Sequence, residues 1–149
     1  MAGNTFSGVS MVGGSLNAYF AKLIINKSGQ SWGGTTAGVI LDEGATMIVD
    51  SGYLTMLSSM GQGVVALNNS HATLNGVTIA RGGHAGLLAI NNSSIDVTSS
   101  NTNLLSTIGD NAVDLFCDSD SKITGTANIA GSPTVQCTNL LSSETVPLP

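Results

Sequence analysis

An internal repeat of about 25 residues constrains the fold of this chain more than any other feature of its sequence. Apolar and turn residues recur in the same order, and the apolar residues before the shared turn are spaced by 26, 23 and 26 residues: Leu41, Leu67, Ile90 and Phe116. A period of this length is typical of one coil of a parallel β-solenoid, in which short strands wrap once and the next coil stacks on top. Leucine-rich repeats have a similar period, but they require a fixed Leu-x-x-Leu-x-Leu pattern that is missing here.

Each copy also opens on a similar dipeptide. These openings are Gly38-Val39, Gly63-Val64, Gly86-Leu87, Ala112-Val113 and Thr134-Val135, with a weaker first copy at Gly8-Val9 and an insertion over 28–34. We therefore predict an all-β chain folded as a single right-handed parallel β-helix of about five or six rungs. A β-sandwich is the alternative fold, although a sandwich does not require the same turn to recur at the same register.

One domain is expected over residues 1–149, because a chain of this length can bury a single core. Residues 38–138 hold the clear repeats, and 1–37 form a weaker first coil or an N-terminal cap. The apolar stretch 16–25 fits either a short capping helix or a strand of that first coil. The tail, 139–149, is expected to fold over the last coil, since its prolines cannot donate to a ladder.

Superposing the copies gives a register for the core. Equivalent residues of neighbouring coils lie about 4.8 Å apart along the axis. One predicted column of large apolar residues is formed by Met47, Leu74, Val97 and Ile123. Ala72 and Ile95 belong to a second column, and Asp96 and Lys122 share a position where they are expected to form an exposed cross-strand pair.

Paired asparagines occupy the shared turn of two neighbouring copies. Asn68 aligns with Asn91, and Asn69 aligns with Asn92. Ordinary turn chemistry is one explanation, because Asn is a common turn residue. An inward ladder of amides is the other, since stacked asparagines hydrogen-bond to one another along the axis of repeated sheets.

Composition excludes several classes of protein. Charged residues are only 9% of the chain and hydrophobic residues are 42%, which argues against disorder and against a bundle of long helices. The net charge is −5, and four scattered Lys and Arg residues offer no basic patch for nucleic acid. No apolar run approaches the roughly 18 residues of a membrane span. The first residues lack the basic start and apolar core of a signal peptide, so the protein is either made without an export signal or is a mature or excised form. The polar, Gly-rich, charge-poor composition favours a form excised from an extracellular or cell-surface protein, and the two cysteines are compatible with that origin.

The Gly-Val/Leu openings, the Asn-Asn-Ser turns and the closing run from Leu115 through Ile129 to Cys137 resemble right-handed parallel β-helix repeat proteins of bacteria. The resemblance is to the pectate-lyase-like superfamily, which contains pectate-lyase-like and polygalacturonase-like enzymes as well as binding and structural proteins. It covers about residues 38–138, and it is a similarity of the repeated rungs and not of a catalytic motif. The resemblance therefore implies the fold and leaves the activity open.

Arg81 and His84 are the strongest candidates for catalysis, because they share a Gly-rich connection that would lie at the rim of a cleft. Polysaccharide-cleaving β-helix enzymes are similar in using Arg or His beside acidic groups. A hydrolase, however, also needs two carboxylates about 5 to 9.5 Å apart, and a lyase usually needs a calcium cluster of acids. Neither is evident in the sequence, so solvated turn residues are the alternative interpretation.

No metal or cofactor site is predicted. His71 takes the position that Ser94 fills in the next copy, and we interpret it as a surface turn residue. Neither His71 nor His84 has a Cys or carboxylate at zinc-ligand spacing. Four acids near the C-terminal end lack the glycine and closing Glu of an EF-hand loop: Asp110, Asp114, Asp118 and Asp120.

Cys117 and Cys137 lie in successive copies, and two states are open for them. Aligning Val113 with Val135 places Cys137 opposite Leu115, which would separate the Cα atoms of the cysteines by more than the roughly 7 Å that a disulfide tolerates. An irregular last coil would instead permit a terminal disulfide. The sequence therefore leaves both a terminal disulfide and two buried free thiols open.

These observations predict a non-enzymatic structural or interaction module from the C-terminal part of a larger secreted or surface protein. Its partner would be a weakly bound polysaccharide or another protein subunit, held at a sheet face or at an end of the solenoid. One alternative is a polysaccharide lyase or glycoside hydrolase that acts through Arg81 and His84. A second alternative is an engineered scaffold.

Overall fold

Short parallel strands make up the computed structural model of this chain, which describes residues 8–19, 22–26, 37–50, 53–57, 62–75, 77–80, 85–97, 103–105, 113–125, 127–129, 135–137 and 145–146. Every regular element in these ranges is a β-strand, so the prediction of an all-β chain is confirmed. All the strand pairs among the described residues are parallel. The antiparallel β-sandwich, our alternative fold, does not fit this pairing.

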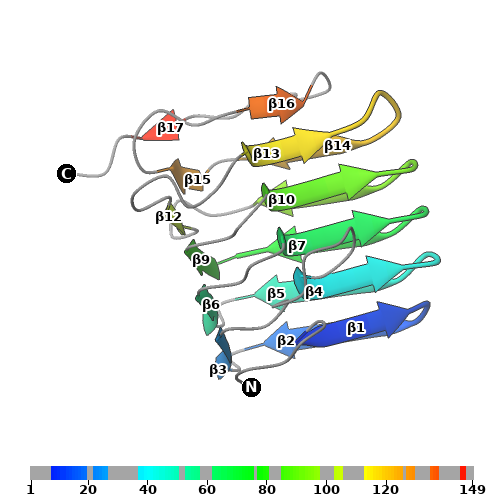
Figure 1. Ribbon diagram of the computed structural model, residues 1–149. Helices are drawn as coiled ribbons and strands as arrows, with labels where there is room; N and C mark the ends of the chain where they lie inside the picture. The colour runs from blue at the N-terminus through cyan, green and yellow to red at the C-terminus, as the bar shows by residue number, and fades with distance from the viewer. Residues whose placement is uncertain are drawn as a thin grey trace.

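The strands form three sheets (Figure 1). The first sheet contains β1 (Val9–Val12), β4 (Ala37–Asp42), β7 (Gln62–Leu67), β10 (Ala85–Ile90), β13 (Val113–Cys117) and β16 (Val135–Cys137). The second contains β2 (Ser15–Tyr19), β5 (Thr46–Asp50), β8 (His71–Leu74), β11 (Ser94–Val97) and β14 (Lys122–Gly125). The third contains β3 (Lys22–Asn26), β6 (Tyr53–Leu57), β9 (Val77–Ala80), β12 (Asn103–Leu105), β15 (Ala127–Ile129) and β17 (Thr145–Val146).

Successive strands belong to the first, second and third sheet in turn, from β1, β2 and β3 to β13, β14 and β15. We call each such set of three strands a tier. The tiers stack so that each strand pairs with the equivalent strands of the neighbouring tiers, and the strands at the two ends of each sheet are paired on one side only (Figure 1). The sequence repeat therefore corresponds to one tier.

Alternation of apolar and polar residues explains why these segments are strands and which face each buries. In β8 and β11 every second side chain is buried, because successive side chains of a strand point to opposite faces. The inward side chains form one core cluster with contributions from all three sheets. Its largest fully buried members are Leu41, Met47, Leu74, Leu87, Ile95 and Ile123.

The turn between the first and second sheets explains the paired asparagines. Asn68, Asn69, Asn91 and Asn92 all have positive φ, between 51° and 65°, which Asn tolerates better than most residues. Their side chains are exposed, so the inward ladder, one of the two explanations, is wrong. The amides nevertheless bond along the stack: Asn91 Nδ2 donates to Asn68 Oδ1 at 2.9 Å, and Asn92 Nδ2 donates to Asn69 Oδ1 at 2.7 Å.

A row of buried serines follows these asparagines and was not anticipated from the sequence. Ser70, Ser93 and Ser121 are each at most 3% exposed. Each hydroxyl oxygen accepts a hydrogen bond from the backbone N–H one tier earlier, donated by Ala45, Ser70 and Ser93 respectively, at 3.1 Å. The serines thus satisfy buried backbone donors where the chain passes from one sheet to the next.

The predicted register is correct for several strand pairs. Val9 pairs with Val39, and Val39 and Leu87 both pair with Val64, as the shared openings require. Leu74 also pairs with Val97, as predicted. Leu41 and Leu67, the aligned apolar residues before the shared turn, are one residue out of register, because Leu41 pairs with Ala66.

Other parts of the predicted register are wrong by two residues. Leu74 pairs with Val49 and not with Met47. Ile123 pairs with Ile95 and not with Val97, whose partner is Gly125. Val113 pairs with Ala85, so the opening at Ala112-Val113 is also displaced. A shift of two residues keeps every side chain on the same face, and hydrophobic alternation therefore cannot detect it.

The cysteines show the same error. Leu115 pairs with Val135, which places Cys137 directly beside Cys117 instead of opposite Leu115. Their Cα atoms are 4.5 Å apart and the structure joins them in a disulfide between β13 and β16. The expected separation of more than about 7 Å is therefore wrong.

Reducing this disulfide is expected to lower the free energy of unfolding by about 3 kcal/mol, because the released 20-residue loop regains chain entropy when the protein unfolds. Urea unfolding with and without a thiol reductant would measure the change. A Cys117→Ser/Cys137→Ser double variant should match the reduced protein and should not respond to the reductant. An unfolding midpoint that is the same in both conditions for the unaltered chain would contradict the prediction.

Strands are found at both ends of the described chain. The stretch 16–25 contributes to β2 and β3, so the capping helix is wrong and the strand interpretation holds. In the tail, Thr145–Val146 forms β17 and pairs with β15, continuing the third sheet. The insertion 28–34 and the opening residues Ala112 and Thr134 lie outside the described residues.

Candidate functional site

The outward surface of the second sheet carries most of the described polar side chains that face solvent from strands. We call it the polar face, and it consists of Ser15, Asn17, Thr46, Ile48, His71, Thr73, Ser94, Asp96, Lys122 and Thr124. Parallel pairing aligns these residues in two rows that cross the five strands. Nine of these ten side chains can form hydrogen bonds, so the face is a regular polar grid.

The outward surface of the first sheet is different. Several of its outward side chains are apolar and belong to a second, smaller cluster, in which Val65 is 1% exposed. Ile40, Leu88 and Ile90 pack against that cluster. The polar grid is therefore a property of the second sheet and not of every outer surface of the chain.

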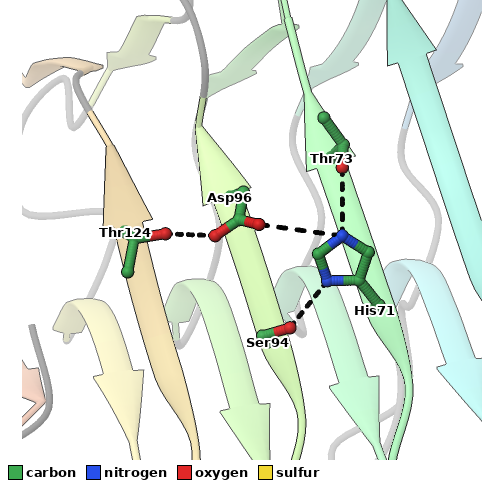
Figure 2. A network of polar contacts seen from close by, with 5 residues as sticks. All are labelled: His71, Thr73, Ser94, Asp96 and Thr124. Atoms are coloured by element: carbon green, nitrogen blue, oxygen red, sulfur yellow. Dashed lines mark hydrogen bonds and ion pairs between the residues drawn. The ribbon is translucent and has the colours of Figure 1, made fainter. Parts of the chain in front are cut away.

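His71 lies at the centre of the polar face (Figure 2). Its Nδ1 is 2.6 Å from Ser94 Oγ on β11, and its Nε2 is 3.1 Å from Thr73 Oγ1 on its own strand. Asp96 Oδ2 lies 3.7 Å from the same Nε2. The other carboxylate oxygen, Asp96 Oδ1, accepts a hydrogen bond from the hydroxyl of Thr124 on β14.

This network corrects two expectations. His71 is the first residue of strand β8 and not a turn residue, and its side chain is 37% exposed. Asp96 does not share a register position with Lys122, because Asp96 pairs with Thr124 and Lys122 pairs with Ser94. The prediction that His71 and Ser94 occupy equivalent positions is confirmed.

Sequence reasoning missed the role of Thr73, Ser94, Asp96 and Thr124. The signal was present in part, since a residue and its neighbour two positions later share one strand face. Placing His71 opposite Ser94 therefore also places Thr73 opposite Asp96. The link to Thr124 required the correct register of β14, which the alignment lacked.

A second polar row follows the turns between the first and second sheets. Asp42 Oδ1 accepts from Asn68 Nδ2 at 2.7 Å, and this row continues through Asn91. The backbone N–H of Asn91 in turn donates to Asp118 Oδ2 at 2.7 Å. This hydrogen bond lowers the pKa of the Asp118 carboxyl below its ordinary value of 3.8, because it stabilises the charged form.

The free energy of unfolding should therefore fall at acidic pH, partly because the Asp118 carboxylate becomes protonated. Its folded pKa lies below its unfolded pKa, so the unfolded chain binds more protons between the two values. The contribution is complete above about pH 4 and is lost as the pH falls through the folded pKa. Urea unfolding from pH 7 downward should give Asp118→Asn a shallower loss of stability below about pH 4 than the unaltered chain. Parallel curves over the acidic range would contradict this assignment.

The candidates for catalysis, Arg81 and His84, lie outside the described residues, as does Asp110. In the part of the chain that the structure describes, no group of three or more His, Cys, Asp or Glu residues could hold a metal ion. Among the same residues, no helix is long and apolar enough to cross a membrane.

Comparisons of the chain with protein-family models, with curated proteins and with solved structures gave no match. What the chain does must therefore be inferred from its own residues and their geometry.

Proposed function

We propose that the chain is a non-enzymatic structural and interaction module, built as a single right-handed parallel β-helix of about five or six rungs. The cyclic order in which strands enter the three sheets supports one continuous coil. Right-handedness is expected because about 98% of crossovers between parallel strands of one sheet have this hand. Rows of bonded serines and asparagines at successive turns support a rigid stack.

The proposed ligand is a polysaccharide that lies along the polar face and binds weakly. The grid of outward polar side chains on five paired strands is the observation that carries this proposal. Sugar hydroxyls donate and accept hydrogen bonds, as do the side chains of Ser, Thr, Asn and His. Within each row, side chains of neighbouring strands lie about 4.8 Å apart and would offer similar contacts to successive units of a polymer, so that weak contacts add.

Two further observations support the proposal. Among the described side chains of the polar face, Asp96 is the only carboxylate, whereas a glycoside hydrolase uses a pair of carboxylates about 5 to 9.5 Å apart. The Cys117–Cys137 disulfide is typical of proteins from oxidising compartments. We therefore propose that the module belongs to a secreted or cell-surface protein and holds a polymer without cleaving it.

Affinity electrophoresis would test the ligand. In native gels that contain hydroxyethylcellulose, the protein should migrate more slowly than in gels without it. An Asn17→Ala/Thr46→Val variant, which removes two polar groups from adjacent strands of the polar face, should lose most of this retardation. The matched control is Ser10→Ala, because Ser10 is exposed on β1 in the first sheet and its loss should leave retardation unchanged. Equal retardation of both variants would contradict binding at the polar face.

A turnover assay would test the non-enzymatic part of the proposal. Incubation with polygalacturonate should give neither unsaturated products, which absorb ultraviolet light, nor new reducing ends. Sustained formation of either product by the unaltered chain would overturn the proposal. In that case, loss of turnover on Arg81→Ala and on His84→Ala would identify the polysaccharide lyase or hydrolase that the sequence offered as an alternative.

A further inference from the structure

We propose that Ser94 is an activated nucleophile that accepts an acyl group from an activated ester, with His71 as its general base. This inference goes beyond polysaccharide binding and does not depend on it. A nucleophilic serine is recognised by a base within about 2.6–3.2 Å and by a third group that orients the base. His71 Nδ1 lies 2.6 Å from Ser94 Oγ, which meets the first condition.

Asp96 and Thr73 meet the second condition. Both place an oxygen atom near His71 Nε2, at 3.7 Å and 3.1 Å respectively (Figure 2). These acceptors favour the tautomer with its proton on Nε2, which leaves the lone pair of Nδ1 facing the Ser94 hydroxyl. Asp96 is in turn held by the hydroxyl of Thr124, so it is a positioning residue for the base.

The site is open to solvent, since His71 and Asp96 are 37% and 36% exposed. A small ester can therefore reach Ser94 from outside without any movement of the sheet. In the proposed step, Ser94 Oγ bonds to the acyl carbon and the bond from that carbon to the leaving oxygen breaks. The hydroxyl proton passes to His71 Nδ1 and then to the departing oxygen. Oxidation states do not change, and the products are an O-acylserine and the free alcohol or phenol.

The backbone around Ser94 determines how long the acyl group stays attached. An acyl-transfer enzyme stabilises its tetrahedral intermediate with free N–H donors. The N–H of Ser94 donates to Ser70 O at 3.0 Å, and the N–H groups of His71 and Lys122 donate to Ala45 O and Ser93 O. These donors are used by the sheets and are not free for an oxyanion, so both formation and hydrolysis of the acylserine lack this stabilisation. An activated ester has a good leaving group and can still react, whereas the O-acylserine is an ordinary alkyl ester. We therefore expect slow loss of the acyl group, so that Ser94 is modified once and is not the centre of a turnover cycle.

Reaction with p-nitrophenyl acetate would test the proposal, with peptide mass mapping to locate the acetyl group. Ser15 is a control within the same molecule, because it lies on the same row of the polar face, is exposed and belongs to β2, two strands from His71. Ser94 should be acetylated on the order of 100-fold faster than Ser15, which is the usual gain from a general base. Exposure alone predicts the opposite order, since Ser94 is only half-exposed.

Three variants separate activation from folding. His71→Asn should reduce acetylation of Ser94 to the rate of Ser15 while leaving the Ser15 rate unchanged. Asp96→Asn should lower only the Ser94 rate, and Asp96→Glu, which restores a carboxylate, should recover part of it. Far-ultraviolet circular dichroism would check that each variant keeps its strands. Acetylation of Ser94 in the unaltered chain no faster than that of Ser15 would overturn the proposal whatever the variants do.

Discussion

Leu74→Ala is expected to lower the free energy of unfolding by about 2–5 kcal/mol. Leu74 is fully buried in β8 and is one of the largest core side chains. Val49 and Val97 are its partners on the two neighbouring strands of the second sheet. Backbone pairing on both sides prevents those strands from closing the gap, so the cost includes the cavity as well as the lost transfer of apolar surface.

Urea unfolding followed by circular dichroism would measure this effect. Val12→Ala is the matched control, because Val12 is a large apolar residue that is 66% exposed on β1. That change should alter stability by no more than about 0.5 kcal/mol. If the two variants were equally stable, Leu74 would not be part of a packed core and the stacking of β5, β8 and β11 would be wrong.

Gly125→Ala should cost more than about 3 kcal/mol, for a reason that concerns the backbone. Gly125 pairs with Val97 and has a φ of 105°, which L side chains rarely adopt. A Cβ at this position would lie 1.7 Å from the carbonyl oxygen of Val97 and 2.6 Å from its carbonyl carbon. Because both atoms belong to the backbone, the sheet itself must move, and β14 would separate from β11.

Gly14→Ala separates the steric cost from the conformational cost. Gly14 also has a positive φ, 76°, but apart from the glycine itself and its two chain neighbours no heavy atom lies within 4 Å of the position of its Cβ. It should therefore lose only the roughly 1–2 kcal/mol of a left-handed residue. Urea unfolding would measure the loss of unfolding free energy in both variants. The larger loss in Gly125→Ala reflects the close approach of β14 to β11. Equal losses would show that this approach does not occur.

The functional proposals share one structural cause. Parallel tiers place the same sequence position of successive repeats in one row, and the turns hold that row through Ser93 and its equivalents. In the proposed function, such a row of polar residues is the regular surface that a polymer binds. Where a row brings together His71 and Ser94, it becomes a pair with its own chemistry. Both proposals depend on how the stacked strands align these residues and not on any single residue.

Much of the fold was available from the sequence. Alternation in segments such as Ser94–Val97 identified strands and the side chains that face the core. The repeat identified which strands are equivalent, and it placed His71 opposite Ser94 correctly. The Asn turns were also predicted, although their amides form an exposed ladder and not an inward one.

Hydrophobic alternation in the sequence determined which strand face most residues occupy, and hence the core and the polar face; the alignment of Leu41 with Leu67, which lie on opposite faces, is the exception. Only the tertiary structure decided which residue on a neighbouring strand is its partner. A slip of two residues leaves the alternation intact, so composition and periodicity are the same in both registers. The register nevertheless decides the partners. Asp96 pairs with Thr124 in the structure and with Lys122 in the predicted register, and Cys137 pairs with Cys117 in the structure and with Leu115 in the predicted register. The disulfide and the links of Asp96 in the His71 network therefore depend on tertiary packing, because pairing of whole strands sets the register.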